Sequence, residues 1–168
     1  SFIVNTIFDL SVRVGFGFDV HQLAEKRPLI LGGVSIPYST GLSGHSDADV
    51  IIHAICDALL GAAGLRDIGF HFPDTDKQYK NIDSKVLLKE VVLQLAGKNY
   101  KVGNIDVTLC LEQPRINPHI PAMKKALAAV IGIAEEDISI KATTNERLGY
   151  IGRGEGAAAY AVALIETT

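Results

Sequence analysis

The sequence lacks the surplus of positive charge that a nucleic-acid-binding protein needs. Lysine and arginine together number 16 against 19 aspartates and glutamates, which gives a formal net charge of -3 at pH 7. Proteins that bind nucleic acid by neutralising phosphates carry a basic face. We therefore expect no nucleic-acid partner. Any anionic ligand would be held locally, by metal ions, backbone N–H groups and a few basic side chains.

Cysteine is scarce as well. The chain has two, Cys56 and Cys110, and each stands in an apolar run without the paired spacing of a metal site. Isolated cysteines in apolar segments behave as small hydrophobic residues, so both are predicted to be buried free thiols. Reduced cysteines suit a cytoplasmic location.

Long hydrophobic runs are also missing. The first ten residues are apolar, but they are too few to cross a bilayer and are interrupted by Asn5 and Asp9. They carry neither the basic segment nor the small-residue cleavage site of a signal peptide. Residues 1–11 are predicted to be an N-terminal extension or a cloning remnant, and no membrane partner is expected.

Repeats and low-complexity linkers are absent, and 168 residues fit one domain, so residues 12–168 are predicted to form a single catalytic domain. Apolar periodicity and capping residues predict three helices, which begin at Asp47 or Asp49, at Asp83 or Ser84, and at Asn117, and which end near Gly64, Gly97 and residue 131. Strands are expected at 12–21, 28–33, 105–111, 138–143 and 157–165, with loops at 38–46, 66–82 and 149–156.

This alternation predicts an α+β fold: an α/β sandwich in which a small mixed sheet carries helices on one face. The other face of such a sheet also needs cover. Self-association would supply it.

Asp19 and His21 carry the clearest metal-binding pattern. Side chains two residues apart on a strand point the same way, so one carboxylate and one imidazole can reach a single ion. A catalytic zinc takes three protein ligands and keeps one position open. Candidates for the third ligand are His45, His53, His71 and His119.

His53 is the favoured third ligand. It lies one helical turn from both Asp49 and Asp57, whose carboxylates are predicted to orient its imidazole. The competing interpretation is a solvated helix face on which His53 is incidental.

Two further segments are suited to phosphate. His45–Asp49 (HSDAD) precedes a helix, and it is either a capping loop or a place where His45 and backbone N–H groups meet an anion. Lys141–Glu146 (KATTNE) offers hydroxyls for phosphate oxygens and a carboxylate suited to magnesium. In Gly149–Gly156, Arg153 stands among glycines, which is either a ligand-contacting loop or a plain hairpin. None of these is a Walker or dinucleotide-binding motif.

Seven segments in register resemble 2-C-methyl-D-erythritol 2,4-cyclodiphosphate (MECDP) synthases. They span the chain from about residue 12 to residue 165. The segments are GFDVH at 17–21, GHSDADV at 44–50 with His53, DIG at 67–69, FPDTD at 72–76, PHIP at 118–121, KATT at 141–144 and GRGEG at 152–156.

The resemblance implies the reaction and its cofactors. The 2-phosphate of 4-diphosphocytidyl-2-C-methyl-D-erythritol 2-phosphate would attack the β-phosphorus and release CMP, in the non-mevalonate isoprenoid pathway. Asp19, His21 and His53 would bind zinc or another divalent transition metal. Glu146 would bind magnesium or manganese together with substrate phosphates. His45 and Thr144 are the implied catalytic residues.

The resemblance also implies a substrate site and an assembly. Its members form homotrimers with intersubunit active sites, and the sheets would face the three-fold axis. The implied ligand is a small cytidine diphosphate substrate. Implied substrate-binding residues are Ser46, Asp67, Gly69, Phe72, Asp74, Asp76, Leu111, Pro114, Arg115, Ala142, Thr143, Tyr150 and Arg153.

Two other functions fit the same residues. A zinc-dependent nucleotide-diphosphate hydrolase would use the same ligands with water as the nucleophile. A non-catalytic trimeric ligand-binding module would use the polar residues only as caps and surface. Product analysis separates the first from a cyclase, and bound metal with CMP release excludes the second.

Overall fold

The protein is described by a computed structural model that covers residues 11–168. A single five-stranded sheet has the order β4-β1-β7-β5-β6, and only the β5–β6 pair is parallel, which makes the sheet mixed, as predicted. Its strands are β1 (Val12–Glu25), β4 (Thr40–Ser43), β5 (Tyr100–Cys110), β6 (Ile138–Thr143) and β7 (Gly156–Thr167). A separate hairpin pairs β2 (Leu29–Leu31) with β3 (Val34–Ile36).

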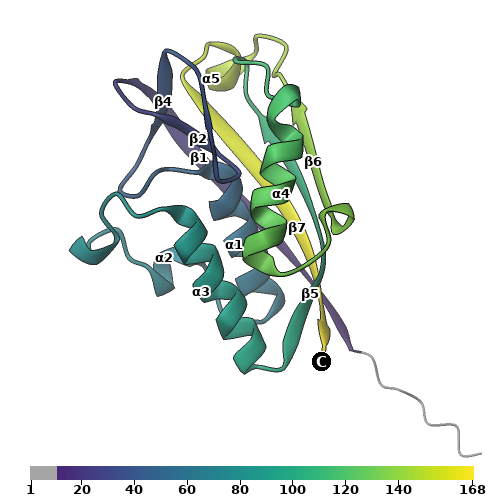
Figure 1. Ribbon diagram of the computed structural model, residues 1–168. Coiled ribbons are helices and arrows are strands. Elements are labelled where there is room, and N and C mark those ends of the chain that lie inside the picture. Colours follow the sequence, from purple (N-terminus) through teal and green to yellow (C-terminus); the bar gives the residue numbers. More distant parts are fainter. Residues whose placement is uncertain (1–10) are drawn as a thin grey trace, which may run out of the picture.

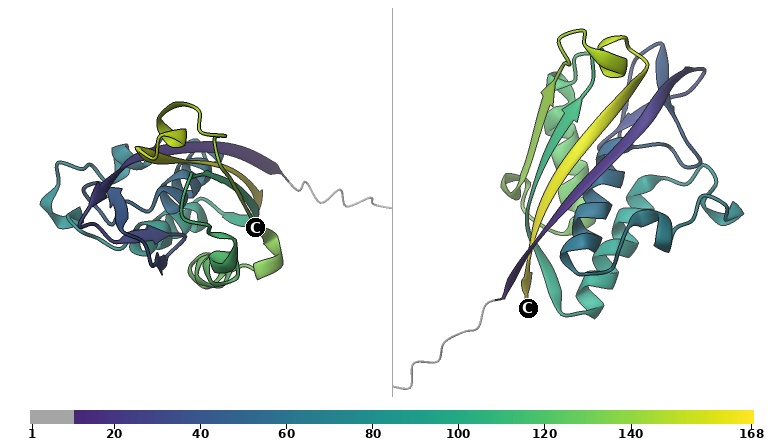
Figure 2. Two further views of the ribbon diagram at one scale, coloured as in Figure 1. Left: turned by 90° about the horizontal axis from the view of Figure 1, so that it is seen from above. Right: turned by 180° about the vertical axis from the view of Figure 1, so that it is seen from behind.

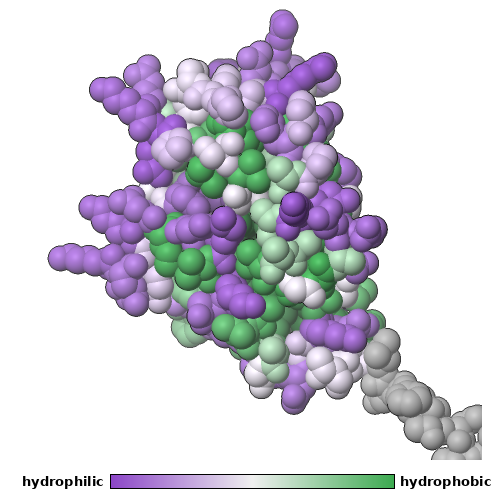
Figure 3. Space-filling view, in the orientation of Figure 1, coloured by the Kyte–Doolittle hydropathy of each residue, from purple (hydrophilic) through white to green (hydrophobic). Residues whose placement is uncertain are grey.

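Three long helices cover one face of this sheet (Figures 1 and 2). They are α1 (Val50–Ala62), α3 (Ser84–Gly97) and α4 (Ile120–Ile131), and the single-turn α2 (Ile68–His71) and α5 (Gly149–Gly152) lie in connections. The space-filling view of this helical side shows polar side chains around apolar areas (Figure 3). The two-layer architecture is the one that the sequence predicts.

Helix α1 is the central helix of the core. Asp49 caps it by accepting a hydrogen bond from the backbone N–H of Ile52, and most of its residues are buried. It packs tightly on β1, because a Cβ at Gly15 or Gly17 would overlap the backbone of α1. The opposing positions of β7 are small as well, namely Ala157, Ala159, Ala161 and Ala163. Small residues on two adjacent strands therefore set the height of α1 above the sheet.

Helices α3 and α4 complete the layer. Of the apolar positions predicted for α3, Leu87, Val91 and Leu95 are buried, but Val86 is 50% exposed and Leu88 is buried in its place. α4 ends where predicted, at Gly132, whose φ of 81° is a left-handed C-cap conformation that favours glycine.

The predicted loops contain regular structure that the sequence analysis missed. The segment 38–46 includes β4, 66–82 includes α2 and a 3-10 turn (Lys77–Tyr79), and 149–156 includes α5. β4 is four residues long and is defined by pairing with residues 22–25, which also extend β1 beyond its predicted end. Such a strand is set by its partner, and its own sequence pattern is too short to predict it.

No long helix covers the second face of the sheet within residues 11–168 (Figure 2). β1 points alternate side chains away from the helices, and apolar side chains of β1 and β7 stand exposed there: Val12, Val14, Phe16, Phe18, Val20, Tyr160 and Val162. The rings of Phe18 and Tyr160 lie 5.0 Å apart between centroids. An apolar surface of this kind marks a contact with another molecule.

Cys56 and Cys110 are free and buried, as predicted. Among residues 11–168, every helix is too short or too polar to cross a membrane. Residues 1–10 of the predicted N-terminal extension lie outside the described residues.

Candidate active site

Asp19, His21 and His53 meet where β1 crosses α1. The Asp19 Oδ2 atom lies 2.9 Å from His21 Nε2 and 3.1 Å from His53 Nδ1, and the two nitrogens lie 3.2 Å apart. A tetrahedral zinc with bonds of about 2.0–2.1 Å needs ligand atoms about 3.3 Å apart. The three donors therefore fit a divalent transition metal, and they form a cluster that could hold one.

The cluster is partly buried and strongly coupled. Burial alone would raise the pKa of the Asp19 carboxyl, but hydrogen bonds from His21 and His53 and their charges lower that pKa to about 2. Burial alone would lower the pKa of His21, but its hydrogen bond to Asp19 and the charge of that carboxylate raise the pKa overall. Asp19 is therefore ionised at neutral pH and available as an anionic ligand.

His21 is oriented by the edge strand that the sequence analysis missed. The Nδ1 atom of His21 lies 3.0 Å from the carbonyl oxygen of Ser43, the last residue of β4. This acceptor requires a proton on Nδ1, so Nε2 is left to face Asp19. Gly44 makes room for the ring, because a Cβ there would lie 3.1 Å from His21 Cε1.

The predicted partners of His53 are wrong. Asp49 has extended dihedral angles at the N-cap of α1, and its carboxylate accepts hydrogen bonds from Gly32, Gly33 and Ile52. The carboxylate of Asp57 accepts instead from the backbone N–H of Ile68.

The Nε2 atom of His53 faces two hydroxyls. It lies 2.9 Å from Ser84 Oγ and 3.2 Å from Ser46 Oγ. From the sequence, Ser84 was predicted only as a possible first residue of a helix. No spacing links it to His53, because it comes from α3, 31 residues away.

The other three candidate ligands lie outside the cluster. His45 Nε2 donates to the carbonyl of Asp76 at 3.0 Å, and His71 Nε2 donates to that of Leu65 at 2.7 Å. His119 belongs to a 3-10 turn (Asn117–His119) before α4. Strand periodicity and helix position therefore selected the three residues whose donor atoms the structure brings together.

A cavity of about 510 Å³ opens beside the cluster of Asp19, His21 and His53. Six residues predicted for the site line it together with Asp19 and His21: His45, Ser46, His53, Gly69, Phe72 and Asp74. Ile68, Tyr79 and Leu87 add an apolar wall that the sequence did not indicate. Two further predicted residues, Asp67 and Asp76, are not part of the lining. Asp67 directly precedes α2, and Asp76 caps the 3-10 turn by accepting a hydrogen bond from the N–H of Gln78.

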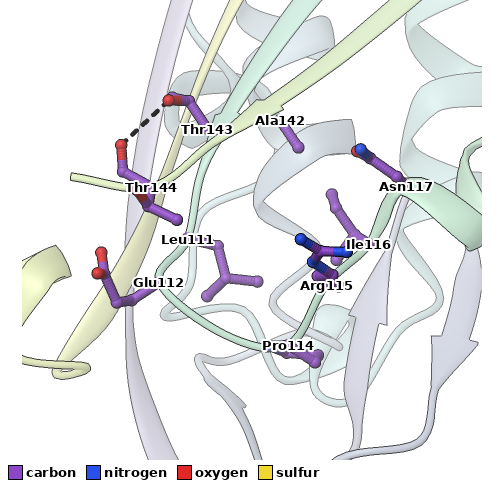
Figure 4. A pocket seen from close by; sticks show the side chains of 9 residues that line it. All are labelled: Leu111, Glu112, Pro114, Arg115, Ile116, Asn117, Ala142, Thr143 and Thr144. Atoms are coloured by element: carbon purple, nitrogen blue, oxygen red, sulfur yellow. Dashed lines mark hydrogen bonds between the residues drawn. The ribbon is translucent and has the colours of Figure 1, made fainter. Parts of the chain in front are cut away.

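A second cavity, of about 160 Å³, lies at the ends of β5 and β6 (Figure 4). Its lining contains the predicted residues Leu111, Pro114, Arg115, Ala142, Thr143 and Thr144, together with Glu112, Ile116 and Asn117. It shares no residue with the cavity at the metal cluster. The implied catalytic pair, His45 and Thr144, therefore occupies two different cavities.

Glu146 sits in a tight turn next to this second cavity. Glu146 and Arg147 both have positive φ, 52° and 61°. The carboxylate of Glu112 holds the turn by accepting hydrogen bonds from the backbone N–H groups of Asn145, at 3.0 Å, and Arg147, at 3.2 Å. This clamp presents the side chain of Glu146 to solvent.

Tyr150 and Arg153 lie apart from both linings. Tyr150 belongs to α5, and the guanidinium of Arg153 pairs with Glu155 at 2.8 Å on the exposed surface. Their predicted role in substrate binding stays a prediction.

Known proteins resemble the chain over nearly its whole length. The model of the YgbB family matches residues 12–166. A 2-C-methyl-D-erythritol 2,4-cyclodiphosphate synthase from Bacteroides thetaiotaomicron is 63% identical over 157 residues, which cover 94% of this chain and 99% of that protein. A protein of the same name from Porphyromonas gingivalis is 62% identical over 153 residues, covering 91% and 94%.

Solved structures agree. The bifunctional IspDF of Campylobacter jejuni matches 95% of this chain and 43% of its own, with a TM-score of 0.91 and 41% identity. A complex of Plasmodium falciparum IspF with CDP matches 94% of this chain and 97% of its own, with a TM-score of 0.83 and 34% identity. The chain belongs to the YgbB family of MECDP synthases, which are cyclising lyases of the non-mevalonate route to isoprenoids.

Proposed function

We propose that the chain converts 4-diphosphocytidyl-2-C-methyl-D-erythritol 2-phosphate into 2-C-methyl-D-erythritol 2,4-cyclodiphosphate and CMP at the Asp19–His21–His53 cluster. The observation that carries the proposal is the convergence of three donor atoms within 3.2 Å of one another beside a cavity of about 510 Å³. One carboxylate and two imidazoles are a zinc donor set. Glu146 would hold magnesium or manganese with the substrate phosphates.

The chemistry needs little from protein side chains beyond placement. An oxygen of the 2-phosphate forms a bond to the β-phosphorus, and the bond from that phosphorus to the oxygen of CMP breaks. The attacking phosphate is already an anion, so the step needs no general base. A divalent cation, when bound, polarises the phosphoryl group and offsets the repulsion between phosphates.

The protein groups around the cluster would position the reacting ends. His45 and Ser46 line the cavity just before α1 and would bind phosphate oxygens there. Ile68, Phe72 and Leu87 would keep water away from the β-phosphorus, which favours cyclisation over hydrolysis. Holding both ends of one flexible substrate supplies the gain of an intramolecular reaction.

The second cavity would hold the cytosine of the substrate. A cytidine nucleotide as ligand is supported by the Plasmodium falciparum relative, which was solved as a complex with CDP. Because the two cavities lie at opposite edges of the sheet, on the β1 side and the β5–β6 side, one substrate would join cavities of neighbouring copies. A homotrimer with its sheets facing the three-fold axis makes that arrangement and covers the apolar sheet face. Thr144 and Glu146 would then act on the substrate bound at a neighbour's metal cluster.

His53→Ala tests the metal assignment. Losing one of three ligands is expected to abolish zinc retention and to lower CMP release on the order of 10³-fold, because the ion supplies several kcal/mol to the transition state. Zinc content by elemental analysis and CMP release are the measurements. The control is His71→Ala, which removes a histidine outside the cluster. Near-normal turnover by a metal-free His53→Ala protein would disprove the assignment.

Product analysis in ¹⁸O-labelled water separates the proposed reaction from nucleotide hydrolysis. The cyclic product forms without incorporating oxygen from water, whereas a hydrolase would give a linear phosphate that carries the label.

A further inference from the structure

Ser84 is a fully buried hydroxyl that joins the metal cluster to a helix which supplies none of the ligands. Its exposed fraction is 0%, and it is the first residue of α3. Its Oγ lies 2.9 Å from His53 Nε2 and also contacts Asp47 Oδ1. The backbone N–H of Ser84 donates to Asp47 Oδ2 at 3.0 Å. Both the side chain and the backbone of Ser84 are therefore fixed by one carboxylate.

Counting protons fixes the direction of each hydrogen bond. An ionised carboxylate only accepts, so the single hydroxyl proton of Ser84 points to Asp47. Asp47 Oδ1 also accepts from the backbone N–H of Asp49, at 3.1 Å. With its proton committed, the Ser84 oxygen can only accept from His53, and the proton of that hydrogen bond therefore sits on Nε2.

The other nitrogen of His53 is then free to bind metal. A neutral imidazole with its proton on Nε2 has a lone pair on Nδ1. Nδ1 lies 3.1 Å from Asp19 Oδ2, and a metal ion bound by both atoms would displace the proton of the hydrogen bond between them. Ser46 Oγ, at 3.2 Å from His53 Nε2, accepts from the N–H of Ala48 and keeps a second lone pair that is compatible with a proton on Nε2.

We infer that Asp47 and Ser84 act together as positioning residues that hold His53 in its metal-binding tautomer and ring orientation. The inference rests on the proposed metal site and adds to it a carboxylate–hydroxyl–imidazole chain, which ties metal retention to the placement of α3. Neither residue touches the reacting atoms. Removing partners of this kind typically costs 10–100-fold in metal affinity.

Ser84→Ala is the central test. The variant leaves His53 Nε2 with only the longer contact to Ser46, so the ring loses its fixed tautomer. We expect the dissociation constant for Zn²⁺, measured by competition with a chelator, to rise about 10–100-fold. The absorption spectrum of the Co²⁺-loaded protein is expected to shift, because it reports ligand geometry directly. Unchanged Zn²⁺ affinity in Ser84→Ala would overturn the inference.

Asp83→Ala is the matched control. The carboxylate of Asp83 caps α3 by accepting from the N–H of Lys85, at 2.9 Å. Within residues 11–168, this carboxylate makes hydrogen bonds and ion pairs with Lys85 alone, so this variant loosens the same helix end without touching the imidazole. We expect its Zn²⁺ affinity to stay at the parent value. An equal loss of affinity in Asp83→Ala and Ser84→Ala would show that helix placement alone is responsible, which would also overturn the inference.

Asp47→Asn provides a second route, which also serves if Ser84→Ala folds poorly. The NH₂ group of the asparagine must face either the backbone N–H or the hydroxyl of Ser84, so one of the two hydrogen bonds that fix Ser84 is lost. Because the two residues act through one hydrogen bond, the double variant is expected to bind Zn²⁺ no more weakly than the worse single variant. Additive losses would contradict the chain. Asp19→Ala separates the two proposals, since Zn²⁺ retention there would refute the metal site itself.

Discussion

Asp49 shows how one buried side chain can connect parts of the chain that bear on the site. It is 0% exposed and accepts hydrogen bonds from the backbone N–H groups of Gly32 at 2.9 Å, Gly33 at 2.7 Å and Ile52 at 3.1 Å. It thereby links the β2–β3 turn to the first turn of α1, four residues before His53. Burial raises the pKa of this carboxyl to about 6, although the three donors oppose the shift.

Asp49→Asn is expected to destabilise the protein although it keeps the size of the side chain. An amide has one acceptor oxygen, so its NH₂ group must face either Gly33 or the pair formed by Gly32 and Ile52. A buried donor facing a donor costs about 1–3 kcal/mol in the free energy of unfolding. Urea denaturation at neutral pH measures it. Asp83→Asn, at an exposed N-cap, is the control, and equal losses in both variants would contradict the argument.

At the scale of residues, the sequence was informative where strand or helix periodicity alone decides direction. Asp19 and His21 were paired correctly because alternate residues of a strand share a side. His53 does lie beside Asp19 and His21, but the carboxylates for which it was favoured accept hydrogen bonds from other groups. Its actual partner Ser84 comes from another helix, and only the tertiary packing of α1 against α3 brings the two together.

Among the elements, the pair β1 and α1 decides whether the site forms. Asp19 and His21 lie on the strand and His53 on the helix, so the three donors meet only at the observed spacing between β1 and α1. Gly15 and Gly17 set that spacing, since neither leaves room for a Cβ beneath α1. Gly17, the one glycine of the GFDVH motif, therefore has a structural role that is separate from the chemistry of the Asp and His of that motif.

Gly17→Ala is expected to lose zinc without altering any ligand. The added methyl group would push α1 away from β1 and carry His53 with it, and such overpacking costs about 1–3 kcal/mol. Zinc content and the thermal midpoint are expected to fall together. The control is Gly61→Ala on α1, where the nearest atom to a new Cβ is 4.0 Å away. That change is expected to stabilise the helix by about 0.5–1 kcal/mol. Full zinc content in Gly17→Ala would contradict the spacing argument.

Long helices and strands with recognisable capping residues could be predicted from the sequence, whereas short ones could not. α1, α3 and α4 were located because each carries an apolar stripe and a recognisable end, such as Gly132. β4 was missed because four residues show no period and their identity as a strand depends on β1. That omission affected the site as well, because the carbonyl of Ser43 in β4 orients His21.

For the whole molecule, the sheet face opposite the helices is the feature that calls for a partner. Phe16, in the middle of β1, is 63% exposed there, among other apolar side chains of β1 and β7. The layers and the mixed sheet were predictable from the alternation of elements. The number of copies that assemble was not, because it depends on the curvature of a surface that no local pattern encodes. The family resemblance supplied the proposed trimer.

Phe16→Glu is expected to dissociate the proposed trimer, because the charge would be buried between copies without a partner. Sedimentation velocity would show a single-chain species. CMP release is expected to fall with it although both cavities of each chain keep their residues, since in the proposed trimer one substrate would join cavities of two copies. Val86→Glu on α3, at a site that is 50% exposed on the helical side, is the control. A fully active single-chain Phe16→Glu protein would exclude an intersubunit site.

The alternation along β1 has a consequence for how the chain can vary. Odd-numbered positions from Gly15 to His21 face the helices and carry the ligands, whereas even-numbered positions from Val12 to Val20 face outward. One inserted or deleted residue between Gly17 and Asp19 would reverse the direction of the side chains that follow it. Asp19 and His21 would then point to the outer face of the sheet, and an apolar side chain such as Val20 would point toward α1. A point substitution in β1 alters either the outward apolar face or the inward-facing polar residues. A change in the length of the strand would disrupt both at once.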